Sequence, residues 1–228
     1  MNFIRLYIYP VVIAILIPLL VLVPYLIAIH QEHVAPFLPY TIAVLSYLQY
    51  LQINTIYTLS ETVIQLKASI MKNRSKIIKF NRWSLFVAIY IVLALTSVVS
   101  FRSNEFPIIH PIIVITLFIA ILVFIALKSW LSLRLSPQIN TKLVAKARVI
   151  ISVIMLISFI ISLVCGIWAF AVTKNTKVKQ RLNWDSKDDG YIPHVISAIT
   201  QWLFLILLSP FFATYFKEMK AMTIHNGV

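Results

Sequence analysis

The sequence predicts an all-α polytopic membrane protein: one domain of six transmembrane helices with both termini in the cytosol. Of the 228 residues, 61% are apolar and only 12% are charged, whereas soluble domains are about half apolar and a quarter charged. Apolar runs long enough to cross about 30 Å of hydrocarbon recur along the chain. The bases lie in short stretches between these runs, as membrane topology requires. We therefore read the net charge of +13 as a sign of a lipid bilayer and not of nucleic acid.

The apolar runs define six expected spans. Their approximate bounds are 8–28, 41–66, 83–101, 110–127, 149–172 and 194–215. The first contains Pro10, Pro18 and Pro24, so we expect a kinked helix, and it is too long to be the core of a signal peptide. The second carries a stripe of polar residues, including Gln52 and Thr55, which we expect to face the bundle rather than lipid.

The distribution of Lys and Arg sets the expected topology. With six spans, 14 of the 20 Lys and Arg residues fall on the side of the N-terminus. The positive-inside rule then places both termini in the cytosol. The basic loops 67–82 and 128–148 lie on the same side, where we expect contact with anionic lipid. We expect Arg148, near the cytosolic start of the fifth span, to extend toward the headgroups.

The stretch 183–202 is the most informative part of the sequence for function. It begins as a polar loop with several aspartates and continues into the sixth span. There His194, Ser197, Gln201 and Trp202 occupy one helical face. Such a face must point toward protein or water, because lipid leaves polar groups unsatisfied.

The expected topology also places four histidines at the non-cytosolic side: His30, His33, His110 and His194. Three explanations remain open. The rings could sense the pH of an acidic lumen, they could bind a metal together with an aspartate, or they could be interfacial residues with local hydrogen bonds. None of the histidine spacings identifies a metal or a cofactor, so we predict neither.

Catalysis and transport are weakly indicated. Ser197 lies one helical turn after His194, which permits a His/Ser pair, but there is no GxSxG motif and no evident third group. We therefore expect no enzymatic activity. The chain has only three glycines, which argues mildly against a channel or transporter, because broken helices and close helix contacts use more of them.

Three segments together resemble the damage-regulated autophagy modulator (DRAM) family, within the wider Frag/DRAM/Sfk six-span superfamily. They are the run 33–40 (His-Val-Ala-Pro-Phe-Leu-Pro-Tyr), the Ile-Ile-His entry at 108–110, and the run 182–202 with its Leu-Asn-Trp and His-Val-Ile-Ser-Ala-Ile motifs. The family usually follows the Pro-Phe-Leu-Pro-Tyr segment with a Ser-Asp-Thr-Gly loop and a Pro-Glu pair, whereas here Thr41 leads directly into the next expected span. It often has His-Asp where this chain has His110-Pro111, and Glu-Trp where it has Gln201-Trp202. Several luminal carboxylates are thus absent, which makes metal binding less expected here.

The resemblance implies a non-enzymatic protein of lysosomal or late-endosomal membranes that modulates autophagy, with unknown protein partners. The alternative is a lipid-modifying or lipid-moving protein like the superfamily members that remodel GPI anchors, in Golgi or plasma membrane. We expect a luminal face of the helix bundle to carry the function. Its candidate residues are His33, Pro36, Tyr40, His110, Asp189, Tyr191, His194, Ser197 and Trp202.

Overall fold

The computed structural model describes residues 11–12, 15, 19, 74–101, 106–137, 140–172 and 187–218. Within these residues the regular structure is entirely helical and consists mainly of four long helices. They are α3 (Arg74–Ser100), α4 (Ile109–Leu135), α5 (Lys142–Val172) and α6 (Tyr191–Ala213). All four are long and apolar enough to cross a membrane. The expected spans 8–28 and 41–66 lie outside the described residues, apart from positions 11, 12, 15 and 19.

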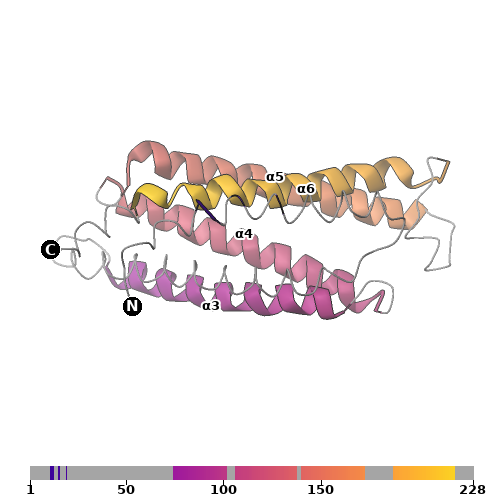
Figure 1. The fold of residues 1–228 in the computed structure, drawn as a ribbon, viewed down its shortest axis with the longest axis horizontal. Coiled ribbons are helices and arrows are strands. Elements are labelled where there is room, and N and C mark those ends of the chain that lie inside the picture. Colours follow the sequence, from indigo (N-terminus) through magenta and orange to yellow (C-terminus); the bar gives the residue numbers. More distant parts are fainter. Residues whose placement is uncertain are drawn as a thin grey trace.

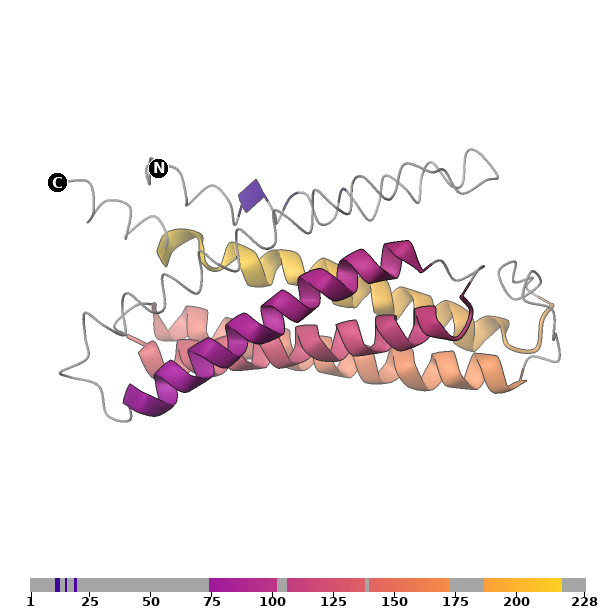
Figure 2. The same cartoon turned by 90° about the horizontal axis from the view of Figure 1, so that it is seen from below.

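The four helices run along the long axis of the molecule, each antiparallel to the next (Figure 1). Helix α4 packs against α3 and α5, and α5 packs against α6. Figure 2 shows α3 crossing α4 on one side of this arrangement. Because consecutive helices alternate in direction, α3 and α5 begin at the end of the bundle where α4 and α6 finish.

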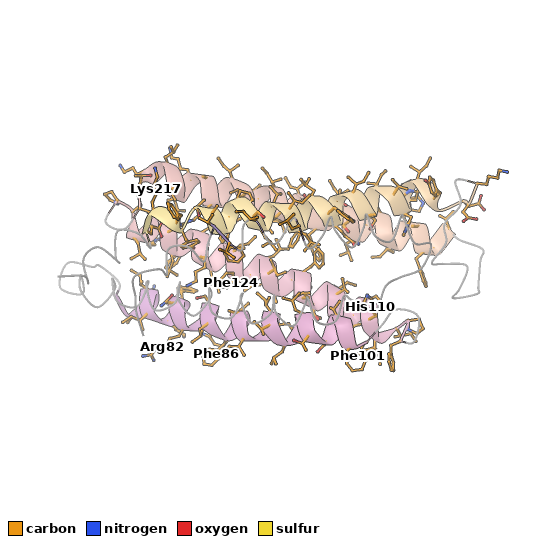
Figure 3. The ribbon with its side chains drawn as sticks, viewed as in Figure 1. Arg82, Phe86, Phe101, His110, Phe124 and Lys217 are labelled. Carbon is orange, nitrogen blue, oxygen red and sulfur yellow. The ribbon has the colours of Figure 1, made fainter. Side chains whose placement is uncertain are left out.

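The two ends of the bundle differ in charge. One end, here called the basic end, has exposed cations from α3, α4, α5 and the short segment that follows α6: Lys76, Lys79, Arg82, Arg134, Lys142, Lys146 and Lys217. The other, here called the histidine end, has His110 near the start of α4 and His194 near the start of α6. Figure 3 shows Arg82 and Lys217 at the first end and His110 with Phe101 at the second.

The helices are longer than the expected spans, and both basic loops are shorter than the sequence predicted. Residues 74–82 belong to α3, and only residues 136–141 separate α4 from α5. The spans had been ended at the first cation, but Lys and Arg are good helix formers, and residues 74–82, 128–135 and 142–148 contain no proline or glycine. At 1.5 Å per residue, the 31 residues of α5 extend about 46 Å, which exceeds the hydrocarbon core and reaches through the headgroup region.

Aromatic rings fill the centre of the bundle. Phe204 of α6 is fully buried, and its ring centroid lies 4.6 Å from that of Phe118 of α4, which in turn stacks on Phe159 of α5 at 6.1 Å. Large apolar side chains also cover the outer surface: Phe86 is 63% exposed and Ile167 62%. A surface of this kind suits acyl chains and not water, so the helices are those of a membrane-embedded protein.

Candidate functional site

At the histidine end, His110 connects the end of α3 to the start of α4. Its Nδ1 lies 2.7 Å from the carbonyl oxygen of Phe101, the residue that follows α3. A carbonyl oxygen can only accept, so Nδ1 carries the hydrogen and donates it. In the neutral ring, Nε2 is then an acceptor and is the nitrogen that this bond leaves for other partners. The ring is half-buried, so it is held by the fold and still reachable.

His194 lies at the same end, in the first turn of α6. A turn over residues 187–190 leads into the helix, where the Tyr191 N–H donates to the Asp188 carbonyl at 3.0 Å and the His194 N–H donates to the Gly190 carbonyl at 3.1 Å. Helix α6 tolerates Pro193 because the first turn needs no N–H donor at that position. The His194 ring and Tyr191 are half-buried, whereas Asp189 is exposed. Helix α5 packs against both α4 and α6, so the two histidines stand on helices that share one neighbour.

Ser197 is buried in the contact between α5 and α6. Its hydroxyl donates to the Ser162 carbonyl oxygen at 2.9 Å and lies 3.3 Å from the Ser162 hydroxyl. A Cβ placed on Gly166 would come within 3.1 Å of Ser197 Oγ, so the glycine allows the two helices to approach closely. Small residues and interhelical hydroxyl bonds are how membrane helices hold together. Ser197 therefore joins two helices, and its hydroxyl is committed to α5.

Gln201 and Trp202 continue this face along α6. The Gln201 side-chain amide donates to Ser197 Oγ at 3.4 Å, and Trp202 is half-buried. The remaining candidate residues, His33, Pro36 and Tyr40, lie outside the described residues. In the part of the chain that the structure describes, no three His, Cys, Asp or Glu residues are grouped so that they could hold a metal ion.

A second polar cluster lies at the basic end, around Arg148. This residue is 1% exposed, so the expectation that it extends to the headgroups is wrong. Its Nη2 donates to Glu218 Oε1 at 2.6 Å, its Nε donates to Thr214 Oγ1 at 2.8 Å, and its Nη1 donates to Ser132 Oγ at 2.9 Å. Its guanidinium also lies 3.6 Å from the centroid of the Tyr215 ring. One arginine of α5 thus joins the last turn of α4 to the end of α6.

The physical reason for this arrangement is the cost of an isolated buried charge. A guanidinium removed from water needs a counter-ion and acceptors for its donors. Glu218 supplies the counter-ion and the hydroxyls of Ser132 and Thr214 supply acceptors. With its amide turned so that the oxygen faces the guanidinium, Asn140 adds a further acceptor 3.1 Å from Nη1.

Lys128 is a second buried cation at this end, and it too had been assigned to a loop. It lies on α4, is 2% exposed, and its Nζ donates to Asn81 Oδ1 of α3 at 3.0 Å. The Nζ also stands 5.9 Å from the centroid of the Phe124 ring. This bond joins α3 to α4 near the point where the Arg148 cluster joins α4, α5 and α6.

These contacts were missed because cations were read as loop residues. One signal was available in the sequence: Glu218 is an acid that closely follows the last apolar run, among basic neighbours. An ionisable residue at the end of a membrane helix is expected to have a partner. The sequence does not identify which base that partner is, and only the packing of α5 on α6 selects Arg148.

The chain is similar to a known protein family and to several of its members. A family model described as the Frag1/DRAM/Sfk1/Cwh43P N-terminal domain matches residues 5–222. DNA damage-regulated autophagy modulator protein 2 of Rattus norvegicus is 24% identical over 213 residues, which are 88% of this chain and 78% of the relative. Modulator protein 1 of Homo sapiens is 24% identical over 214 residues, which are 89% of this chain and 86% of the relative.

No solved structure matches the chain. The family model covers nearly the whole sequence and the relatives align over most of their own length, as the motifs around His110 and His194 had predicted. The chain therefore belongs to the DRAM family of membrane proteins, within the Frag1/DRAM/Sfk1/Cwh43P superfamily.

Proposed function

We propose that the protein modulates autophagy from a lysosomal or late-endosomal membrane and does so without enzymatic chemistry. The observation that carries this proposal is the set of aligned relatives, which are named as autophagy modulators. The site geometry supports it, because the side chains of Ser197, Arg148 and Lys128 are engaged in joining helices. None of these three is arranged as a nucleophile with a base.

We also propose that the full chain has six spans, with the basic end in the cytosol and the histidine end in the lumen. The charge difference between the ends supports this orientation. In the described part of the chain, Glu218 is the one acidic side chain at the basic end, against seven exposed cations. Cations are retained on the cytosolic side of membrane proteins.

The orientation can be tested with two single-cysteine variants. After Cys165→Ser, which removes the one native cysteine, Lys142→Cys marks the basic end and Lys187→Cys marks the histidine end; both positions are exposed. In intact isolated organelles, a membrane-impermeant maleimide should label the first variant and leave the second unlabelled until detergent is added. The reverse pattern would overturn the proposed orientation.

The proposed luminal face includes His110 and His194, so the double substitution His110→Ala and His194→Ala should impair function. We expect autophagic flux, measured as turnover of an autophagosome marker with and without lysosomal inhibition, to fall toward that of cells lacking the protein. A tagged copy should colocalise with lysosomes both before and after the substitution. The physical reason is that the fold holds both imidazole rings half-buried at this end, where they can still contact a partner.

Ile192→Ala is the matched control, since Ile192 lies on the same turn of α6 and is 71% exposed. It should leave flux unchanged. If the histidine variant keeps wild-type flux while reaching lysosomes, the histidine face is not the functional face. If membrane lipid composition changes and flux does not, the modulator proposal fails in favour of lipid chemistry.

A further inference from the structure

A hollow at the basic end lies between the first turns of α3 and the last turns of α4. It has a volume of about 530 Å³, within the range of about 300–1,000 Å³ typical of small-ligand pockets. Its lining consists of three cations, three aromatic rings and one aliphatic residue: Lys76, Lys79, Arg134, Phe80, Trp83, Trp130 and Ile77. No acid lines it.

Helical periodicity builds this hollow from both helices. Lys76, Lys79, Phe80 and Trp83 stand at i, i+3, i+4 and i+7 on α3, which is one face of the helix. The Phe80 ring packs on Trp130 of α4 with centroids 4.7 Å apart. On α4, the Arg134 guanidinium lies 5.4 Å from the Trp130 ring centroid, so the floor is aromatic and the rim is cationic.

The cations of the rim are free to bind an anion. Among the described residues, Lys76, Lys79 and Arg134 form no ion pair. Arg148 at the same end has a dedicated carboxylate 2.6 Å away. The hollow therefore concentrates positive charge without neutralising it, which raises the local affinity for negative ligands.

An apolar groove borders this hollow on the same two helices. It has a volume of about 440 Å³ and shares Trp83 with the hollow. Its walls are apolar except for Tyr90 and Thr116: Trp83, Phe86, Val87 and Tyr90 of α3 with Thr116, Ile119, Ala120 and Val123 of α4. The hollow and the groove together are called the strip below. Trp83 and Phe86 are 54% and 63% exposed, so the strip opens onto the outer surface of the helices. Figure 3 shows Phe86 and Arg82 near this end of α3.

The polar-to-apolar order of the strip matches one leaflet of a bilayer. From Lys76 to Tyr90 the helix rises about 21 Å, roughly half of the 40–45 Å thickness of a bilayer with its headgroups. The cations stand at the headgroup level and the groove runs toward the middle of the membrane. Interfacial tryptophans and bases are common at helix ends, but that composition alone does not produce a charged hollow with an apolar groove beside it.

We propose that this strip binds a phospholipid whose headgroup carries a phosphate monoester. The phosphate lies among Lys76, Lys79 and Arg134, and one acyl chain follows the groove past Trp83 and Phe86. A monoester carries about −1.5 to −2 charge near neutral pH, which suits three cations. Headgroups that carry an ammonium group are disfavoured, because none of the described residues that line the hollow is an acid that could pair with it. This binding does not depend on the proposed role in autophagy.

The test measures binding of phosphatidic acid to the purified full chain in phosphatidylcholine nanodiscs. The triple variant Lys76→Gln, Lys79→Gln and Arg134→Gln should lose at least about tenfold in affinity. The matched control, Lys142→Gln, Lys146→Gln and Lys217→Gln, removes the same charge from the same end outside the strip and should change affinity less than about threefold. Equal losses in both variants would reduce the effect to general surface charge and overturn the proposal.

Two further measurements identify the ligand and do not depend on variants. Inorganic phosphate and a short-chain, water-soluble phosphatidic acid should compete at least about tenfold more weakly than the long-chain lipid, since they do not occupy the groove. Competition by inorganic phosphate equal to that of the lipid would mean a soluble ligand.

A photoreactive acyl chain on phosphatidic acid should crosslink the wild type within 83–90 or 116–123, and adducts confined to other helices would overturn the proposal. Failure here leaves the autophagy proposal standing, and loss of the autophagy role leaves this binding intact.

Discussion

Replacing Glu218 with alanine should destabilise the protein by about 3–5 kcal/mol, because it leaves Arg148 buried without its counter-ion. The two side chains are 6% and 2% exposed and 2.6 Å apart, so water and salt screen them little. The free energy of unfolding in mixed detergent, titrated from mild to denaturing, should show the loss. The temperature at which the protein stops eluting as a single species should fall with it.

The matched control is Lys217→Ala, which removes an exposed charge from the neighbouring position and should change stability by less than about 0.5 kcal/mol. A double variant, Arg148→Met with Glu218→Leu, tests the cause. Replacing a buried pair with apolar residues is often nearly neutral, and Thr214 keeps its bond to the Phe211 carbonyl at 2.6 Å. The double variant should therefore be more stable than Glu218→Ala. Equal destabilisation by both would show that the charge of Arg148 is not the reason.

Replacing Gly166 with leucine should separate α5 from α6. A Cβ alone would approach Ser197 Oγ to 3.1 Å, and the larger side chain has to displace Ser197 from the Ser162 carbonyl. Overpacking costs about 1–3 kcal/mol, and the lost interhelical bond about 0.6 kcal/mol more. Leucine is a better helix former than glycine by about 0.8 kcal/mol, so any net loss of stability in the same detergent titration comes from the helix contact.

The neighbouring variant Ile167→Leu is the control, since Ile167 is 62% exposed and should be neutral. Gly166→Ala should cost less than Gly166→Leu. Adding Ser197→Ala to Gly166→Ala should recover part of that cost, because the contacting hydroxyl is then absent. If Gly166→Leu is as stable as Ile167→Leu, the close contact between α5 and α6 does not limit stability, and Ser197 is not needed to join them.

The elements of the fold that could be predicted are those encoded by long apolar runs. The spans 110–127, 149–172 and 194–215 correspond to α4, α5 and α6, and 83–101 corresponds to most of α3. Most of their ends were placed inside the helices, by up to nine residues, because composition marks where the hydrocarbon begins and not where the backbone stops being helical. The prolines near His110 and His194 lie in first turns, where they permit a helix to begin.

The candidate sites likewise include features that the sequence predicts and features that only helix packing decides. The sequence predicts that His110 and His194 stand at one end of the bundle, because consecutive spans alternate in direction. That Ser197 bonds to Ser162 depends on which faces of α5 and α6 meet, and a serine in a membrane helix can equally bond its own backbone. The lipid strip likewise needs α3 and α4 to pack so that Trp83 and Trp130 lie beside one hollow.

The sequence alone determined the membrane class, the helical secondary structure and the family, because each depends on local composition or on motifs that stay together along the chain. The tertiary structure decided which charges are buried and with which partners. Arg148 and Glu218 are 70 positions apart, and nothing local distinguishes a cation that reaches for headgroups from one that turns into the bundle. That choice is set by helix packing, since a buried charge is stable only where a distant part of the chain brings its counter-ion.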